Sequence, residues 1–275
     1  MLVHATGLTV AKWRRQHFDN FLTSNWATPC QPPLVASVAD DHYQSKGQVM
    51  SVLSPDGRSI AIAGSSREFT GTWGFKCTLR RQANLVALNV AAAGSYETVR
   101  RHNGTLEKSV RREVSFRDVA LMSYETEEES VYTTFLWRSA HHELYWTVAG
   151  RDVSFSVFTE MMAAVDLNDS ASGLLVTPRR GTGTSVTMVL AANTLTNLCA
   201  VAITPTTSPS IRVPAHSGKQ VKGGVMWRTD TRRQDGSLER TATIAGATAV
   251  TDLGFFDPDA PANVELAENF QVAIG

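Results

Sequence analysis

The chain has little cysteine, and the cysteines it has are far apart. They are Cys30, Cys77 and Cys199. An odd number of distant cysteines is a poor disulfide framework, and none of them belongs to the close pair that typically begins a zinc site. The sequence therefore argues against a disulfide-stapled or zinc-stapled fold. It predicts that Cys77, on the apolar face of a strand, is a small buried side chain.

An excess of one charge is also missing. The 26 Lys and Arg residues balance the 26 Asp and Glu residues, and formal net charge is zero. A nucleic-acid-binding domain normally carries a basic patch, so nucleic acid is not an expected partner. The N-terminal residues 1–7 contain no basic segment followed by a long apolar run. We therefore expect neither a signal peptide nor membrane insertion, and we expect folding in a bacterial-type cytoplasm.

The sequence contains no recognisable metal-binding motif. His141-His142-Glu143 is the one histidine cluster, but a zinc protease needs two histidines four residues apart on a helix. Neighbours on a strand point to opposite faces, so we expect no metal there. Residues 166–170 begin like a calcium loop, yet Ala171 and Thr177 stand where an EF-hand needs Gly and Glu. Turn formation explains these side chains better.

Catalytic motifs are missing as well. The glycine-rich residues 180–185 lack the Lys-Ser/Thr ending of a phosphate loop, and residues 215–219 lack the spacing of a nucleophile elbow. The acidic residues 125–129 are contiguous, which is typical of a solvated turn and not of two carboxylates across a cleft. We predict that the chain is not an enzyme and has no catalytic, metal-binding or cofactor-binding residues.

Alternation with a period of two is what the sequence does have, most clearly in residues 67–79. Phe69, Trp73, Phe75, Cys77 and Leu79 alternate there with mostly polar side chains. A period of two places one set on each face of a strand. The stretch predicts a strand of an antiparallel sheet that covers a core with one face and meets water with the other.

A first β unit is predicted around this strand, in residues 41–165. A Ser54-Pro-Asp-Gly57 turn should join two strands at 47–53 and 58–63. The Ala- and Leu-rich residues 82–92 predict a helix that ends near Gly94. Further strands are expected at 110–124, 131–138, 144–148 and 153–158, with a short helix at 159–165. Residues 1–40 contain Pro29, Pro32 and Pro33 and are expected to form an arm on a neighbouring surface.

A second β unit is predicted in residues 174–275, after a polar, turn-forming boundary at 166–173. Thr, Val and Ala dominate there, and short apolar runs alternate with turns. That pattern is typical of a β-sandwich or jelly roll. The expected strands are 174–177, 184–191, 198–204, 210–213, 221–228, 238–245, 248–255 and 264–273. The predicted fold class is mainly β with a few short helices: an N-terminal antiparallel β domain with one helix, then a C-terminal jelly-roll-like sandwich.

Two sets of side chains are candidates for contacts with partners. Arg100, Arg101, Arg111 and Arg112 flank a predicted hairpin turn at 103–104, which would gather them. An anionic partner, a solvated hairpin face, or ion pairs between subunits would each explain these arginines. Trp227 lies on the strand predicted at 221–228. It is either buried or exposed with a ring face on which a sugar can stack.

The succession of elements over residues 41–140 resembles a known family. The strand pair 47–53 and 58–63, the strand 68–79, the helix 82–92, a loop, the segment 112–118 and a closing strand at 132–136 follow one another. This order resembles the N-terminal domain of tail proteins of long-tailed bacteriophages, especially distal-tail and minor tail proteins of phages infecting actinobacteria. Residues 174–275 are similar to the carbohydrate-binding-like jelly rolls appended to such proteins, through residues 213–228 and the closing residues 263–274.

This resemblance implies a structural virion protein of a siphophage tail tip or baseplate, assembled in the host cytoplasm. The implied partners are further copies of the chain in a trimeric or hexameric ring, other phage tail proteins, and a glycan of the host surface. The family offers no catalytic residues. The alternatives that stay open are a carbohydrate-binding module that contacts the host cell surface, and a cell-wall glycan hydrolase.

Overall fold

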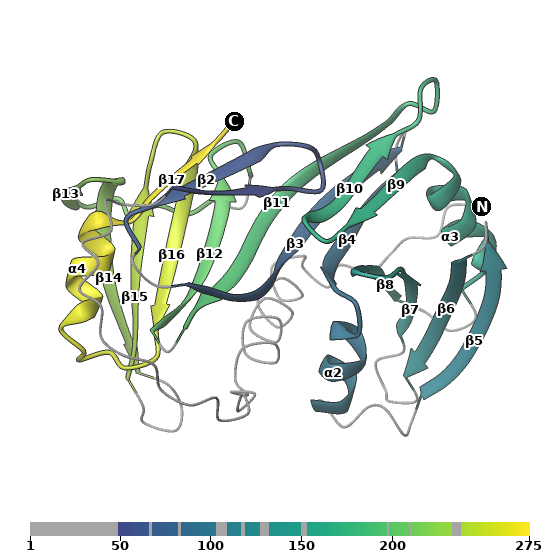
Figure 1. Ribbon diagram of the computed structural model, residues 1–275, viewed down its shortest axis with the longest axis horizontal. Coiled ribbons are helices and arrows are strands. Elements are labelled where there is room, and N and C mark those ends of the chain that lie inside the picture. Colours follow the sequence, from purple (N-terminus) through teal and green to yellow (C-terminus); the bar gives the residue numbers. More distant parts are fainter. Residues whose placement is uncertain are drawn as a thin grey trace.

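One twelve-stranded antiparallel sheet organises the computed structural model (Figure 1). The structure describes residues 49–65, 68–81, 84–102, 109–116, 119–126, 132–149, 153–196, 198–209, 211–232 and 238–275. The predicted arm, residues 1–40, lies outside them. In sheet order the strands are β13 (Lys219–Val221), β14 (Gly224–Arg232), β15 (Leu238–Ala245), β16 (Ala249–Phe255), β12 (Cys199–Pro205), β11 (Thr184–Leu195), β3 (Phe69–Arg81), β4 (Asn84–Ala92), β8 (His142–Ala149), β7 (Tyr132–Arg138), β6 (Val119–Thr126) and β5 (Ser109–Phe116).

The central strand β3 confirms the predicted alternation. Trp73, Phe75, Cys77 and Leu79 are all buried on one face. β3 pairs with β4 on one side and with β11 on the other. The mainly β fold with a few short helices, the predicted class, is confirmed, and the described residues contain three helices.

The helix predicted at residues 82–92 is wrong, because this stretch is strand β4. Val86, Leu88 and Val90 alternate with smaller or polar side chains, and the strands β3 and β8 flank β4 on both sides. Pairing on two sides and burial of the alternating side chains outweigh the helix propensity of Ala and Leu, which is only a few tenths of a kcal/mol per residue, roughly.

The helix forms one segment later, as α2 (Ser95–His102). Glu143 of β8 accepts hydrogen bonds from the backbone N–H groups of Gly94 and Tyr96, so a carboxylate holds the start of the helix. Residues 103–108 lie outside the described residues. The predicted turn at residues 103–104 falls among them, and the elements on its two sides are helix α2 and a strand, β5.

A second layer covers the face of the sheet that carries Phe75 and Cys77. It consists of the three-stranded sheet β1 (Met50–Leu53), β2 (Ser59–Ala63) and β17 (Gln271–Ile274), the hairpin β9 (Val165–Ser170) and β10 (Gly173–Pro178), and the helices α3 (Phe155–Ala163) and α4 (Ala262–Asn269). Ile60 and Ile62 of β2 and Phe158 of α3 belong to the same hydrophobic cluster as Phe75. Helix α2 packs on the opposite face, where Tyr96 contacts Tyr145.

The predicted Ser54–Gly57 turn is confirmed, and it is anchored on the sheet. Gly57 has φ of 86°, a conformation that glycine adopts at little cost. β11 carries an irregularity between Met188 and Leu190 in its pairing with β3. At this bulge the Met188 N–H donates to Asp56 (2.7 Å), and Arg58 donates to the Met188 carbonyl (3.0 Å). The turn therefore satisfies backbone groups at the bulge.

Other predicted elements also differ from the structure. The single strand predicted at residues 110–124 is two strands, β5 and β6, which pair with each other. Residues 153–158, a predicted strand, begin helix α3, whose N-cap Ser154 accepts from the N–H of Ser156. Residues 264–273, a predicted strand, are divided between α4 and β17, with Asn269 as the last helical residue. Residues 211–213 have no strand geometry. Residues 153–158 and 264–273 are short runs that fit either period, so packing decides there between helix and strand.

Hydrogen bonding is continuous across the predicted boundary at 166–173. This stretch forms β9 and its turn into β10. β11 of the predicted second unit pairs with β3 of the first, and β17 pairs with β2. One hydrophobic cluster contains residues from both units, from Ile60 to Phe270. The predicted units 41–165 and 174–275 therefore share one sheet and one core.

Candidate functional site

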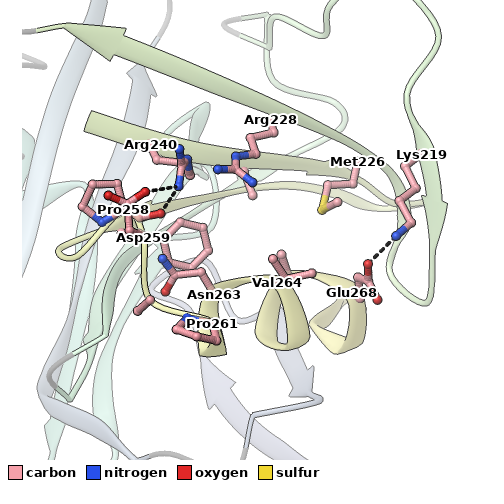
Figure 2. Close-up of a pocket in the computed structure, with 14 residues that line it drawn as sticks. Lys219, Met226, Arg228, Arg240, Pro258, Asp259, Pro261, Asn263, Val264 and Glu268 are labelled. Carbon is pink, nitrogen blue, oxygen red and sulfur yellow. Dashed lines mark hydrogen bonds and ion pairs between the residues drawn. The ribbon is translucent and has the colours of Figure 1, made fainter. Parts of the chain in front are cut away.

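A pocket lies between helix α4 and the strands at the β13 end of the large sheet (Figure 2). Its volume is about 490 Å³. The wall on the sheet side comes from β13, β14, β15 and β16, and the opposite wall from α4 and the loop before it. The lining residues are Lys219, Met226, Arg228, Arg240, Ala242, Phe255, Pro258, Asp259, Ala260, Pro261, Asn263, Val264, Ala267 and Glu268.

Strand periodicity and small residues explain why this space exists. Met226 and Arg228 are two residues apart on β14, so both point to the face on which α4 lies. Arg228 is opposite Ala242 of β15 in the antiparallel register. Ala242 and, from the helix, Ala267 are buried and carry only methyl groups. Larger side chains at these positions would fill the gap between sheet and helix.

Arg240 connects the strand side of the pocket to the loop before α4. Its Nε and Nη2 atoms donate to the two carboxylate oxygens of Asp230 at 2.8 and 3.0 Å, a bidentate pair. Its Nη1 donates to the Pro258 carbonyl and to Asp259 at 3.2 Å. The hydrogen bonds from Arg240 hold the pKa of Asp230 below its usual value. Arg240 is thus a fixed structural part of the wall.

Two lining residues have hydrogen-bonding capacity to spare among the described residues. Asn263 is 4% exposed; its amide donates to the Asp257 carbonyl at 2.6 Å, while its Oδ1 is buried without a partner. The Arg228 side chain is 48% exposed, and its Nε lies 3.6 Å from Asp230, beyond hydrogen-bonding distance. One group offers an acceptor, and the other offers guanidinium donors.

Charges of opposite sign balance at the pocket. Lys219 and Glu268 form an ion pair that joins β13 to the end of α4 (Figure 2). The lining residues include three cations, Lys219, Arg228 and Arg240, and two anions, Asp259 and Glu268. A third anion, Asp230, lies just outside the lining and pairs with Arg228 and Arg240. The pocket therefore has no strong net charge with which to attract an ion.

Trp227, the predicted sugar-stacking residue, lies on β14 but outside the pocket. It is 8% exposed, and its indole N–H donates to the His216 carbonyl at 2.7 Å. Burial was the other interpretation that the sequence left open, and the structure has the ring buried. Arg228, the next residue, points to the opposite face and lines the pocket.

Of the four predicted arginines, Arg100 is the one whose side chain the structure describes. Arg100 is 7% exposed on α2, lies 3.5 Å from Glu97 and stacks over the Tyr96 ring. The side chains of Arg101, Arg111 and Arg112 lie outside the described residues, as do those of the acidic residues 125–129. The backbone places Arg111 and Arg112 on β5, the last strand of the sheet.

The other polar clusters that the sequence suggested hold backbone segments in place. Asp169 of β9 accepts from the N–H of His141 and contacts the His142 ring at 2.7 Å, which joins β8 to the β9–β10 hairpin. Buried Glu143 accepts from Arg138 at 2.9 Å besides holding the start of α2. No group of three metal-ligating side chains occurs within the part of the chain that the structure describes.

The glycine-rich residues 180–185 cover the end of the turn between β10 and β11 and the first two residues of β11. Gly181 and Gly183 both have positive φ, which glycine adopts readily in a turn. β10 pairs with β9, and β11 pairs with β3 and β12, so the two strands that this turn joins do not form a hairpin. None of the described helices is both long and apolar enough to cross a membrane.

The sequence did not identify Arg228, Arg240 or Asn263 as site residues. The available signal was Arg228-x-Asp230, a spacing that places both charges on one face of a strand. Arg240 and Asn263 join them through strand pairing and the docking of α4. Comparison with known proteins found no matching family model, no matching curated protein and no matching solved structure.

Proposed function

We propose that the chain is a structural subunit that assembles with further copies of itself into a ring, as part of a bacteriophage tail tip or baseplate. The observation that supports assembly is the end of the large sheet. There β5, eight residues long, pairs with β6 on one side, and no described strand pairs with its other side. Unpaired N–H and C=O groups on such an edge are a template for a strand of another chain.

A ring needs two different surfaces that meet head to tail. The sheet ends at β5 on one side and at the three-residue β13 on the other, and the small sheet ends at β1 and β17. We propose that β5 of one copy joins an edge of this second group on the next copy. The tail-protein resemblance of residues 41–140 supports the assignment to a virion.

The polar clusters described above support a structural role over catalysis. Asp56, Glu143 and Asp169 each accept hydrogen bonds from backbone N–H groups of neighbouring segments. Carboxylates employed in this way stabilise the fold.

Light scattering over a concentration series tests the assembly. We expect a discrete trimer or hexamer, or growth to closed rings, which electron microscopy would then show. A chain that stays monomeric at the highest accessible concentration would overturn self-assembly into a ring.

Proline substitutions along β5 identify the edge. N–H groups of successive residues on an edge strand alternate between the neighbouring strand and the open side. Of Val114→Pro and Ser115→Pro, one variant removes a hydrogen bond to β6 and lowers stability. The other removes an outward N–H and blocks assembly with less change in the unfolding midpoint. Equal assembly by both variants would exclude β5 as the interface.

A further inference from the structure

The pocket beside α4 has the chemistry of a site for a small, neutral, hydroxylated ligand. Its volume of about 490 Å³ lies within the range of roughly 300–1,000 Å³ that is usual for small-molecule sites. The three cations and three anions around it leave no net charge for an ionic ligand to neutralise. An anion at Arg228 would also face Asp230, which lies 3.6 Å from the Arg228 Nε.

Hydrogen-bonding groups of both kinds surround the space. Arg228 supplies donors, since it is half exposed and forms only a long contact with Asp230. Asp259, 83% exposed, supplies an acceptor at the rim. Asn263 Oδ1 is a further acceptor and has no partner among the described residues. Neighbouring atoms cover this oxygen, so the proposed contact with a ligand hydroxyl requires those atoms to shift.

Apolar groups lie between these polar ones. Figure 2 shows Met226 on the strand side of the pocket and Val264 on the helix side. Val264 is 50% exposed, so part of its aliphatic surface is open at the pocket. A ligand with C–H groups on one face would cover this surface.

We infer that the pocket binds a neutral sugar residue. A pyranose ring carries hydroxyl groups that donate and accept, and it has a C–H face for Met226 and Val264. Its hydroxyls accept from Arg228 and donate to Asp259 and to Asn263 Oδ1. This inference goes beyond the assembly proposed above, and it places sugar binding on the face of β14 opposite to Trp227.

Saturation-transfer NMR on the full chain tests the site. The probes are methyl α-D-glucopyranoside, methyl β-D-galactopyranoside and N-acetylglucosamine, with glucuronate, glucosamine and N-acetylalanine methylamide for comparison. We expect transfer to at least one of the neutral sugars and weaker transfer to the two charged ones. Absence of transfer to all three neutral sugars, or transfer to the peptide analogue alone, would overturn the inference.

Arg228→Gln locates the site, because it removes a charged donor from an exposed position without affecting the core. Loss of a hydrogen bond from a charged group should weaken sugar binding by about tenfold or more. Arg232→Gln, four residues along the same strand and outside the pocket, is the matched control and should bind as the unchanged chain does. Equal binding by Arg228→Gln and the unchanged chain would refute the assignment.

Asn263→Leu tests the deep acceptor, with Asn269→Leu on the same helix as its control. Circular dichroism first establishes that each variant is folded. We expect loss of sugar binding for Asn263→Leu only, and if that variant does not fold, Arg228→Gln decides. Light scattering of the same samples separates the two proposals, because these pocket variants should assemble like the unchanged chain.

Discussion

Two Arg–Asp pairs on the large sheet, one against β11 near its middle and one near its β13 end, show how burial changes the role of the same interaction. Asp56 and Arg58 lie against the bulge of β11, where the Asp56 side chain is 6% exposed. Asp230 and Arg240 lie at the wall of the pocket, where Asp230 is 41% exposed. The first pair satisfies buried backbone groups. The second is in contact with water and contributes mainly to orienting a wall.

Removal of the buried carboxylate should lower the stability of the fold more than any other change to these pairs. Asp56→Ala leaves the Arg58 guanidinium and the Met188 N–H without their common acceptor in a largely buried place. We expect a loss of about 3 kcal/mol in the free energy of unfolding. Urea denaturation measures it. A loss under 1 kcal/mol would show that the turn does not anchor on the bulge.

Acid should reproduce part of that loss. Burial alone would raise the pKa of Asp56, but hydrogen bonds from Arg58, Met188 and Ser54 hold this pKa below the usual 3.8. A carboxyl whose pKa is lower in the folded state stabilises the fold above its unfolded pKa. The contribution is lost as pH falls below 3.8 through the folded value. Unfolding midpoints between pH 7 and pH 2 should therefore fall less in Asp56→Asn than in the unchanged chain.

A third aspartate, Asp252, differs from Asp56 and Asp230, because its pKa is raised while theirs are lowered. Burial raises the pKa of Asp252 on β16, and the hydrogen bond that Asp252 accepts from the Thr243 hydroxyl offsets this shift only in part. A raised carboxyl pKa means that ionisation opposes folding at neutral pH. Asp252→Asn should gain about 1 kcal/mol at pH 7 and almost nothing at pH 3. A destabilised Asp252→Asn at pH 7 would contradict this account.

The exposed carboxylate should matter least. Asp230→Ala removes the bidentate partner of Arg240, but water and Asp259 remain close to the guanidinium. We expect the smallest loss of stability among these variants, because solvent-exposed ion pairs contribute little. Thermal unfolding of Asp230→Ala beside Asp56→Ala gives the contrast directly. Similar losses in both variants would remove the distinction by burial.

The sequence predicted the fold best where a strand has one buried face and one polar face. The alternation of Phe75, Cys77 and Leu79 located β3, and the predicted strand 238–245 has the bounds of β15. Prediction failed for β4, because Ala and Leu favour a helix in isolation and only β3 and β8 supply the competing partners. The sequence predicted that a helix ends near Gly94, but in the structure helix α2 begins directly after Gly94.

Local sequence patterns could not predict the pocket. Arg228 and Arg240 meet because β14 and β15 pair in one particular register, and Asn263 joins them because α4 docks on that face. For Trp227 the sequence left burial and sugar stacking open, and the structure has the ring buried on the face of β14 opposite to the pocket.

The pairing of β17 with β2 has a consequence for synthesis of the chain. Gln271 lies opposite Ala63, about 200 residues earlier in the sequence. During translation β2 leaves the ribosome long before β17 has been synthesised. In the same way, β3 is synthesised before its partner β11. Contacts of such large sequence separation slow folding and leave strand edges open in the meantime. Newly made chains therefore pass through a period in which a neighbouring nascent copy competes for the edge that β17 finally covers.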